Sequence, residues 1–263
     1  MAKKKDTQQD LGSFEALVDI IARLRAPDGC PWDRKQTHSS IRPYLIEEAY
    51  EALQALDEEN SDKLREELGD LLLQIVLHAQ MAREAGEFDI GDVIRGIATK
   101  LVRRHPHVFG DSKASNAEEV ALAWETLKQD ERKPGESLLA SVPKGMPALS
   151  YSHSIQRRAA GVGFDWKDSE GVLAKLAEEV SELQRASTTQ QKIHEFGDVL
   201  FALVNVARWQ GLNLEEALRL ANERFCRRFR HMEEVCRERG LSLRDLSFEE
   251  QNALWDEAKE HTR

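Results

Sequence analysis

The sequence predicts an all-α protein built from a tandem repeat of two helical-bundle units. Apolar residues recur at helical spacing along most of the 263 residues. Stretches in which polar and apolar residues alternate, as they do in strands, are nearly absent. A short pattern of acidic residues also occurs twice in the same order, which indicates an internal repeat.

Apolar periodicity and capping residues place a helix in most parts of the chain. Three helix starts carry a capping box, in which a polar cap and an acidic residue three positions later bond each other's backbone. The three pairs are Asn116 with Glu119, Asn213 with Glu216, and Ser247 with Glu250. The predicted helices cover residues 13–25, 40–57, 61–85, 90–104, 116–130, 148–159, 169–187, 190–210, 213–239 and 247–261.

Helix-breaking residues concentrate between the two copies of the repeat, from Pro134 and Gly135 to Gly145 and Pro147. We therefore predict a linker over 133–147, an N-terminal domain over 13–132 and a C-terminal domain over 148–263. Residues 1–12 are basic but lack the apolar core of a signal peptide, so we expect a disordered tail there.

The composition argues against several classes of protein. A net charge of −10 disfavours binding to nucleic-acid polymers, which usually needs a basic face. No apolar run approaches the ~20 residues that span a membrane. The three cysteines, Cys30, Cys226 and Cys236, form no Cys-x-x-Cys pair, so zinc and redox motifs are not indicated. A reducing cytoplasm is the expected location.

The repeated acidic pattern carries the strongest functional signal. In each copy, carboxylates three positions apart share one helix face, and a second pair with the same spacing follows. The first copy holds Glu47, Glu48, Glu51, Glu67 and Asp70, and the second holds Glu178, Glu179, Glu182, Glu195 and Asp198. Like charges on one face repel each other, and a hard divalent cation that needs several oxygen ligands would relieve the repulsion.

The alternative is a pair of solvated helix faces that form ion pairs with Lys and Arg. Two observations favour a metal site. Gly69 and Gly197 lie between the acidic residues, inside helices, where glycine costs roughly 1 kcal/mol relative to alanine but lets a helix or ligand approach. The acidic residues also run directly into the apolar segments 71–77 and 199–204, where unpaired carboxylates are costly.

The type of ligand selects the metal. All the candidate ligands are oxygens, which suits Mg²⁺, or Mn²⁺ as an alternative, better than zinc or copper. A di-iron bundle would need Glu-x-x-His, and none of the eight histidines has an acidic residue three positions before it. Since protein-bound Mg²⁺ usually takes phosphate oxygens as further ligands, we expect a substrate that carries phosphate.

Basic residues repeat in the same order as the acidic ones. Lys100 and Arg104 in the first copy correspond to Arg224 and Arg228 in the second. Each pair lies one helical turn apart, which is suitable for holding a polyphosphate. A solvated face, or a favourable charge near a helix end, is the alternative.

An aromatic residue with a lysine one turn later also repeats. Trp124 with Lys128 corresponds to Trp255 with Lys259. An indole can stack on a nucleobase while the lysine reaches phosphate. A tryptophan is more often a core residue, and that alternative stays open here.

The segments 71–77 and 199–204 are apolar almost all round, which is typical of a helix in the middle of a bundle. One unit alone would leave part of this surface uncovered. Packing of like units, within the chain or between two chains, would bury the remainder, and we expect a homodimer formed through bundle faces.

With these residues in place, the chain resembles the MazG nucleoside triphosphate pyrophosphohydrolases, which belong to the all-α NTP pyrophosphatase superfamily. The resemblance covers nearly the full length. Its motifs are the acidic signature, Cys30-Pro31-Trp32-Asp33-x-x-Gln36-Thr37, the segments 103–109 and 162–166, and Trp255-x-x-x-Lys259.

The resemblance implies Mg²⁺-dependent hydrolysis of (deoxy)nucleoside triphosphates to monophosphate and pyrophosphate, as nucleotide-pool housekeeping by a tandem-domain homodimer. The resemblance also implies that the C-terminal copy contains the active site. Relatives carry a lysine where this chain has Gln191, with Lys192 next to it. Matched by motif, the metal ligands are Glu179, Glu182, Glu195 and Asp198, with Glu48, Glu51, Glu67 and Asp70 at the same positions of the first copy. The triphosphate would contact Arg224, Arg228 and the segment 175–179, which begins at Lys175, and the nucleotide would contact Trp255.

We expect Glu178 to orient or deprotonate the attacking water. The competing class of function is non-enzymatic: an acidic helical scaffold, or a regulatory protein that binds nucleotides. It predicts no magnesium-dependent release of pyrophosphate.

Overall fold

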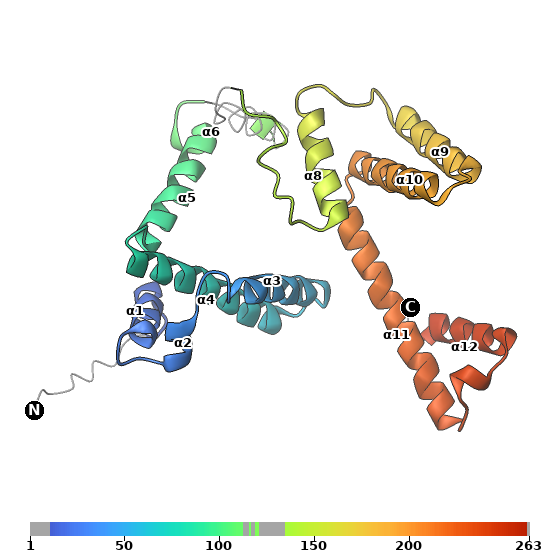
Figure 1. Ribbon diagram of the computed structural model, residues 1–263, viewed down its shortest axis with the longest axis horizontal. Coiled ribbons are helices and arrows are strands. Elements are labelled where there is room, and N and C mark those ends of the chain that lie inside the picture. Colours follow the sequence, from blue (N-terminus) through green and yellow to red (C-terminus); the bar gives the residue numbers. More distant parts are fainter. Residues whose placement is uncertain (1–10, 113–115, 117–118, 121–134, 262–263) are drawn as a thin grey trace, which may run out of the picture. The chain divides into compact units, whose positions relative to one another are not determined.

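The computed structural model describes residues 11–112, 116, 119–120 and 135–261. Within these residues every regular element is a helix, which confirms the predicted all-α class (Figure 1). The chain divides into two compact units, Met1–Trp124 and Glu125–Arg263. Trp124 and Lys128 lie outside the described residues, as do most of the helix predicted over 116–130 and the tail over 1–10. The domain boundaries proposed from the sequence therefore stay a prediction.

The first unit is built around a helical hairpin. Helices α3 (Arg42–Asp57) and α4 (Ser61–Ala85) pack along each other, and α1 (Phe14–Arg25) packs against α4. The other described elements are α2 (Pro31–Lys35), α5 (Ile90–Arg104) and α6 (Pro106–Phe109). The core of this unit contains Ile21, Ile41, Val76, Leu77 and Met81.

The second unit repeats the hairpin. Helices α9 (Ser169–Arg185) and α10 (Thr189–Trp209) pack along each other, and α8 (Ala148–Ala160) packs against α10. Helix α11 (Leu214–Glu238) then leads to η1 (Leu243–Asp245) and α12 (Phe248–His261). Helix α12 packs on the later part of α11, where Met232, Val235, Cys236, Leu254 and Ala258 form a second core.

Local chemistry explains where the hairpin helices begin and end. Helix α4 begins after Asn60, whose side chain accepts from the amides of Asp62 and Lys63, and it ends at Gly86, whose φ of 72° is left-handed. Helix α10 begins with a reciprocal capping box between Thr188 and Gln191. Gln191 therefore has a structural role at the start of the helix.

Of the capping boxes predicted from the sequence, one is complete at α12, and at α11 the bonds accepted by the capping side chain are formed. Ser247 and Glu250 form the full reciprocal box before α12. Asn213 caps α11 by accepting from the amides of Glu215 and Glu216. The sequence analysis did not predict the short helices α2 and α6. Each begins with a proline, Pro31 in α2 and Pro106 in α6, and proline is favoured in the first turn of a helix.

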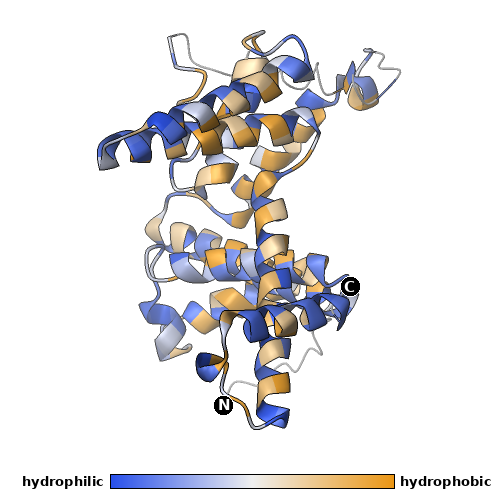
Figure 2. Cartoon of the chain, turned by 90° about the vertical axis from the view of Figure 1, so that its right-hand side faces the viewer, coloured by the Kyte–Doolittle hydropathy of each residue, from blue (hydrophilic) through white to orange (hydrophobic). Residues whose placement is uncertain are grey.

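Within its own unit, the second helix of each hairpin keeps large apolar side chains exposed. Leu72 and Ile75 of α4 are 36% and 44% exposed, and Leu200 and Phe201 of α10 are 49% and 43% exposed. Figure 2, coloured by hydropathy, shows hydrophobic residues along several of the helices. The prediction that these helices lie in the middle of a bundle therefore requires a partner surface beyond those the unit itself supplies.

Candidate metal and nucleotide site

The second hairpin brings the predicted metal ligands of the C-terminal copy together. Glu179 and Glu182 are three residues apart on α9, and Glu195 lies opposite them on α10. One carboxylate oxygen from each of the three lies within 4.8 Å of the others. Three oxygen ligands at this spacing suit a divalent cation.

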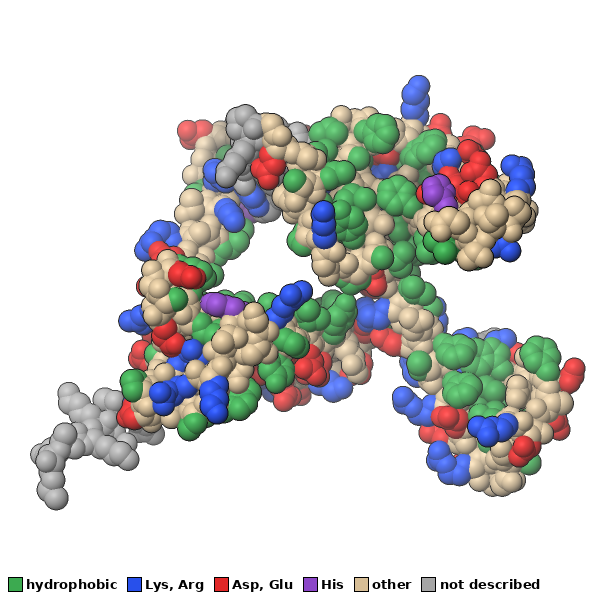
Figure 3. Space-filling model, viewed as in Figure 1, with side chains coloured by type: hydrophobic (Ala, Val, Ile, Leu, Met, Phe, Trp, Pro, Cys, Tyr) green, Lys and Arg blue, Asp and Glu red, His purple; other side chains and the backbone are tan. Residues whose placement is uncertain are grey.

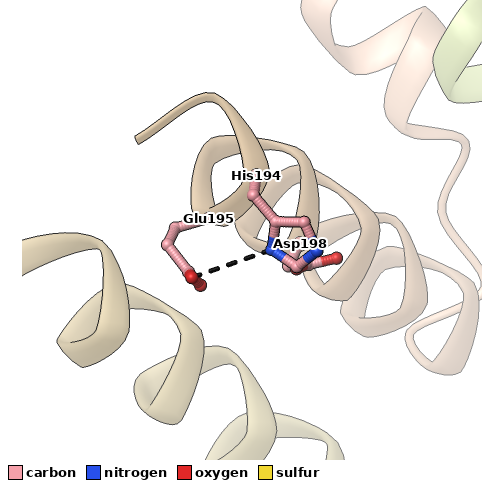
Figure 4. Close-up of side chains that lie close together, drawn as sticks. All are labelled: His194, Glu195 and Asp198. Atoms are coloured by element: carbon pink, nitrogen blue, oxygen red, sulfur yellow. Dashed lines mark ion pairs between the residues drawn. The ribbon is translucent and has the colours of Figure 1, made fainter. Parts of the chain in front are cut away.

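The fourth predicted ligand, Asp198, lies on α10, and one ligand atom from each of His194, Glu195 and Asp198 lies within 4.8 Å of the others (Figure 4). Nδ1 of His194 lies 2.9 Å from Oδ2 of Asp198 and 3.7 Å from Oε1 of Glu195. Sequence reasoning did not single out His194, although a histidine four residues before an acidic residue lies on the same helix face. The first copy has Glu66 at this position (194 − 128).

Glu179 is the most buried member of the cluster, with 5% of its surface exposed. Its carboxylate lies 2.7 Å from Nζ of Lys175, which also lies 3.0 Å from Glu178. Hydrogen bonds to Glu179 and then to Glu178 raise the pKa of Lys175. Lys175 therefore supplies the positive charge that a buried carboxylate needs, and a metal ion would share Glu179 with this lysine.

The first hairpin builds the corresponding cluster. Glu48 and Glu51 of α3 and Glu67 of α4 each place a carboxylate oxygen within 4.8 Å of the other two. Desolvation, followed by the charge of Asp70, raises the pKa of Glu48. Desolvation and the charge of Glu51 raise the pKa of Glu67. Carboxyl groups that repel one another in this way fit the expectation of a bound cation.

The basic and aromatic residues of the second copy gather at a different place in the unit. Arg228 of α11 lies over the ring of Trp255 of α12, 5.8 Å from its centroid, and the Trp255 ring also contacts Phe225 at 5.1 Å. Lys259 pairs with Asp256 at 2.8 Å. Arg224 lies one turn before Arg228 on α11 and is exposed. Figure 1 shows α12 towards the far end of α11 from α9 and α10.

The remaining candidates lie on exposed helix surfaces. Lys100 and Arg104 are on α5, which packs against α4 and α6. Lys192 is exposed in the first turn of α10, one residue after the capping Gln191. In the second unit, one chain therefore brings Lys175 to the acidic cluster, while Arg228, Trp255 and Lys259 gather where α12 packs on α11.

Taken together, the described residues define an all-α protein with two tandem hairpin units, each of which carries a carboxylate cluster suited to a divalent cation. The family model of the MazG nucleotide pyrophosphohydrolase domain matches residues 36–109 and 167–233, which include both clusters. The chain belongs to the MazG family.

Relatives match nearly the whole chain. It is 49% identical over 247 residues to the nucleoside triphosphate pyrophosphohydrolase/pyrophosphatase MazG of Thermotoga maritima, a match that covers 94% of this chain and 95% of the relative. It is 46% identical over 257 residues to the nucleoside triphosphate pyrophosphohydrolase of Escherichia coli K12, covering 95% and 98%. The uncharacterized protein YabN of Bacillus subtilis is 50% identical over 255 residues, covering 95% of this chain and 52% of YabN.

Proposed function

We propose that this chain hydrolyses nucleoside triphosphates, with ribose or deoxyribose, to nucleoside monophosphate and pyrophosphate, and that Mg²⁺ bound in the C-terminal unit assists the reaction. The observation that carries the proposal is the meeting of Glu179, Glu182 and Glu195 within 4.8 Å across two helices. The names of the relatives from T. maritima and E. coli support the choice of substrate class.

The donor set supports a hard cation, since carboxylate oxygens supply every predicted ligand. Bound Mg²⁺, or Mn²⁺ in its place, would polarise phosphate oxygens and orient the attacking water. Glu178 is exposed next to the cluster and held by Lys175 at 3.0 Å, so it is placed to accept a proton from that water. Lys175 offers a positive charge to the triphosphate beside Glu179.

The basic groups of α11 and α12 would complete the site in a homodimer. Arg224 and Arg228 would neutralise charge on the departing pyrophosphate, and Trp255 with Lys259 would contact the nucleotide. Because α12 packs on the later part of α11 in its own chain, we propose that a second copy supplies these groups. The exposed apolar faces of α4 and α10 support association of this kind.

Lys192, on α10, is a further candidate contact for the triphosphate. Lys100, Arg104 and Trp124 would have the corresponding roles in the first copy. No helix of the described part of the chain is both long and apolar enough to cross a membrane. We propose the cytoplasm, where nucleoside triphosphates are plentiful, as the place of action.

The test is product analysis by ³¹P NMR, with a panel of nucleoside triphosphates incubated with the full chain, with Mg²⁺ or with a chelator. We expect nucleoside monophosphate and pyrophosphate in equal amounts, and only when Mg²⁺ is present. Diphosphate with orthophosphate would contradict the proposed reaction. The absence of turnover with every triphosphate would favour the scaffold or regulatory alternative.

A further inference from the structure

A deep cavity lies beside the carboxylate cluster of the second unit. It has a volume of ≈ 660 Å³, which is within the usual range of small-molecule sites, about 300–1,000 Å³. Its walls come from α8, α9, α10, the loop between α8 and α9, and Leu139, which precedes α8 in the chain. Glu179, Asp198 and Lys175 are part of the wall, so the cavity adjoins the proposed metal site. Figure 3 shows acidic side chains gathered around a histidine over this part of the molecule, with apolar side chains next to them.

The lining of this cavity is mostly apolar and partly aromatic. Phe164 and Trp166 come from the loop, and Phe201 comes from α10. Phe164 is 83% exposed, which is costly for a large apolar ring unless something covers it. The Trp166 ring lies against the first turn of α9, where a Cβ on Gly171 would stand 3.1 Å from it. Rings placed in this way offer stacking surfaces for a flat heterocycle.

Besides the charged side chains of Lys175, Glu179, Asp198, Asp165 and Arg208, two amide side chains line the cavity. Gln156 is 7% exposed, and its Nε2 donates to the carbonyl of Phe201 at 2.8 Å. Its Oε1 is buried and has no hydrogen-bond partner among the described residues. A buried acceptor without a partner is costly, and a ligand that donates a hydrogen bond would remove this cost.

Asn205 lies one turn after Phe201 on α10 and complements Gln156. Its Oδ1 accepts from Nη2 of Arg208 at 2.7 Å and from Nε at 3.1 Å. The group that Asn205 can offer a ligand is therefore the Nδ2 donor. An acceptor on Gln156 and a donor on Asn205 match the edge of a nucleobase, which carries both kinds of group.

The first unit differs at this place. Helices α4 and α10 align at an offset of 128 (195 − 67), so Asn205 corresponds to Leu77 and Ala202 to Gln74. Leu77 is 5% exposed and belongs to the core of the first unit. The position that provides a hydrogen-bond donor in the second unit is thus part of the packed core in the first.

We infer that the cavity between α8, α9 and α10 binds the base of the nucleoside triphosphate, with the triphosphate directed toward Glu179 and Asp198. The inference rests on the proposed function and adds the residues that select the base. It places the base between aromatic rings and sets Gln156 and Asn205 against its hydrogen-bonding edge. The first unit, with Leu77 in its core, would bind metal without recognising a base in this way.

The test uses two variants of the full chain, each checked for unchanged helix content by circular dichroism. Ala159→Phe fills the cavity from α8, and Asn205→Leu removes the donor. The matched control is Asn222→Leu, the same exchange at an exposed position of α11. Binding of nucleoside monophosphates and of pyrophosphate is measured by calorimetry with Mg²⁺, so that the result does not depend on turnover.

We expect Ala159→Phe to weaken binding of monophosphates about 10-fold or more, because stacking of one base contributes about 1–3 kcal/mol. Asn205→Leu should weaken it about 5-fold, because one hydrogen bond contributes about 1 kcal/mol. Binding of pyrophosphate, which has no base, should change by less than about 2-fold. Unchanged monophosphate binding in Ala159→Phe would overturn the inference. An equal loss of pyrophosphate binding would also overturn it, because the metal site would then be the part affected.

The two proposals fail in different ways. If the wild type binds monophosphates in the cavity but releases no pyrophosphate, the proposed reaction is wrong and the binding site stands. If it releases pyrophosphate while Ala159→Phe keeps the wild-type kcat/KM for every base, the reaction stands and the cavity does not hold the base.

Discussion

The two units share a hairpin and a carboxylate cluster but differ in what lies beside the cluster. In the first unit, Leu77 and Val76 pack into a closed core. In the second, Asn205 faces a cavity of ≈ 660 Å³ whose wall includes two of the acidic residues. A repeat can therefore keep the groups that hold a cation while only one copy offers a space for a substrate next to them.

The largest difference in stability is expected from substitutions at Leu77 and at its counterpart Asn205. Leu77→Asn places an amide in a closed core and removes apolar contacts, so it should destabilise the first unit by about 2–4 kcal/mol. Asn205→Leu should change the stability of the second unit by less than about 1 kcal/mol, because the cavity has room for the side chain. Hydrogen exchange of peptides from α4 and α10 measures the two units separately. Similar effects in both units would show that Leu77 and Asn205 do not differ in how tightly their surroundings are packed.

A smaller effect is expected at the two helical glycines between the acidic residues. A Cβ at Gly69 or Gly197 would meet nothing within 4 Å in the single chain. Gly69→Ala and Gly197→Ala should therefore each stabilise an isolated chain by about 1 kcal/mol through helix propensity.

If a second copy packs against these faces, the same changes should instead weaken the dimer. Sedimentation at several protein concentrations, combined with thermal unfolding, separates these outcomes. A gain in stability with no change in association would show that no helix approaches Gly69 or Gly197 closely.

The smallest effect concerns one histidine in each unit. Burial and the neighbouring His38 lower the pKa of His78, and burial with the charges of Arg157 and Arg208 lowers the pKa of His153. The folded state then binds a proton less readily than the unfolded state, so stability is full above the ordinary pKa of 6.5 and falls as the pH drops below it.

Replacing either histidine by glutamine should remove its part of this pH dependence. The difference in unfolding free energy between wild type and variant should shrink between pH 7.5 and 5.5. Chemical denaturation at several pH values measures it, with His107→Gln, on the short helix α6, as the control. A constant difference across this range would mean that neither histidine titrates in the way described.

Much of the fold follows from the sequence because it depends on local chemistry. The helix predicted over 61–85 matches α4, Ser61–Ala85, since Asn60 and Gly86 mark its two ends. The acidic clusters were predictable for a similar reason. Spacing of three on a helix puts two carboxylates on one face, and a divalent cation that needs several oxygen ligands would draw two such rows together.

Other features depend on which helix packs against which, and periodicity does not specify this. The sequence grouped Trp255 with the acidic residues, while α12 packs on the later part of α11 in the same chain. The cavity also escaped prediction, because it depends on the distance of α8 from α10 and on the loop that carries Phe164. His194 was missed because its importance comes from a contact with Asp198.

The central claim is that catalysis belongs to the carboxylate cluster of the second unit. The most direct measurement is magnesium-dependent pyrophosphate release by Glu195→Gln/Asp198→Asn beside the matched double variant Glu67→Gln/Asp70→Asn. Loss of the metal site removes several kcal/mol of transition-state stabilisation, so the first variant should lose at least ~1,000-fold in kcat. The matched variant should retain most of the activity, and both should keep their helix content. Full activity of Glu195→Gln/Asp198→Asn, with loss of activity only in Glu67→Gln/Asp70→Asn, would contradict this claim.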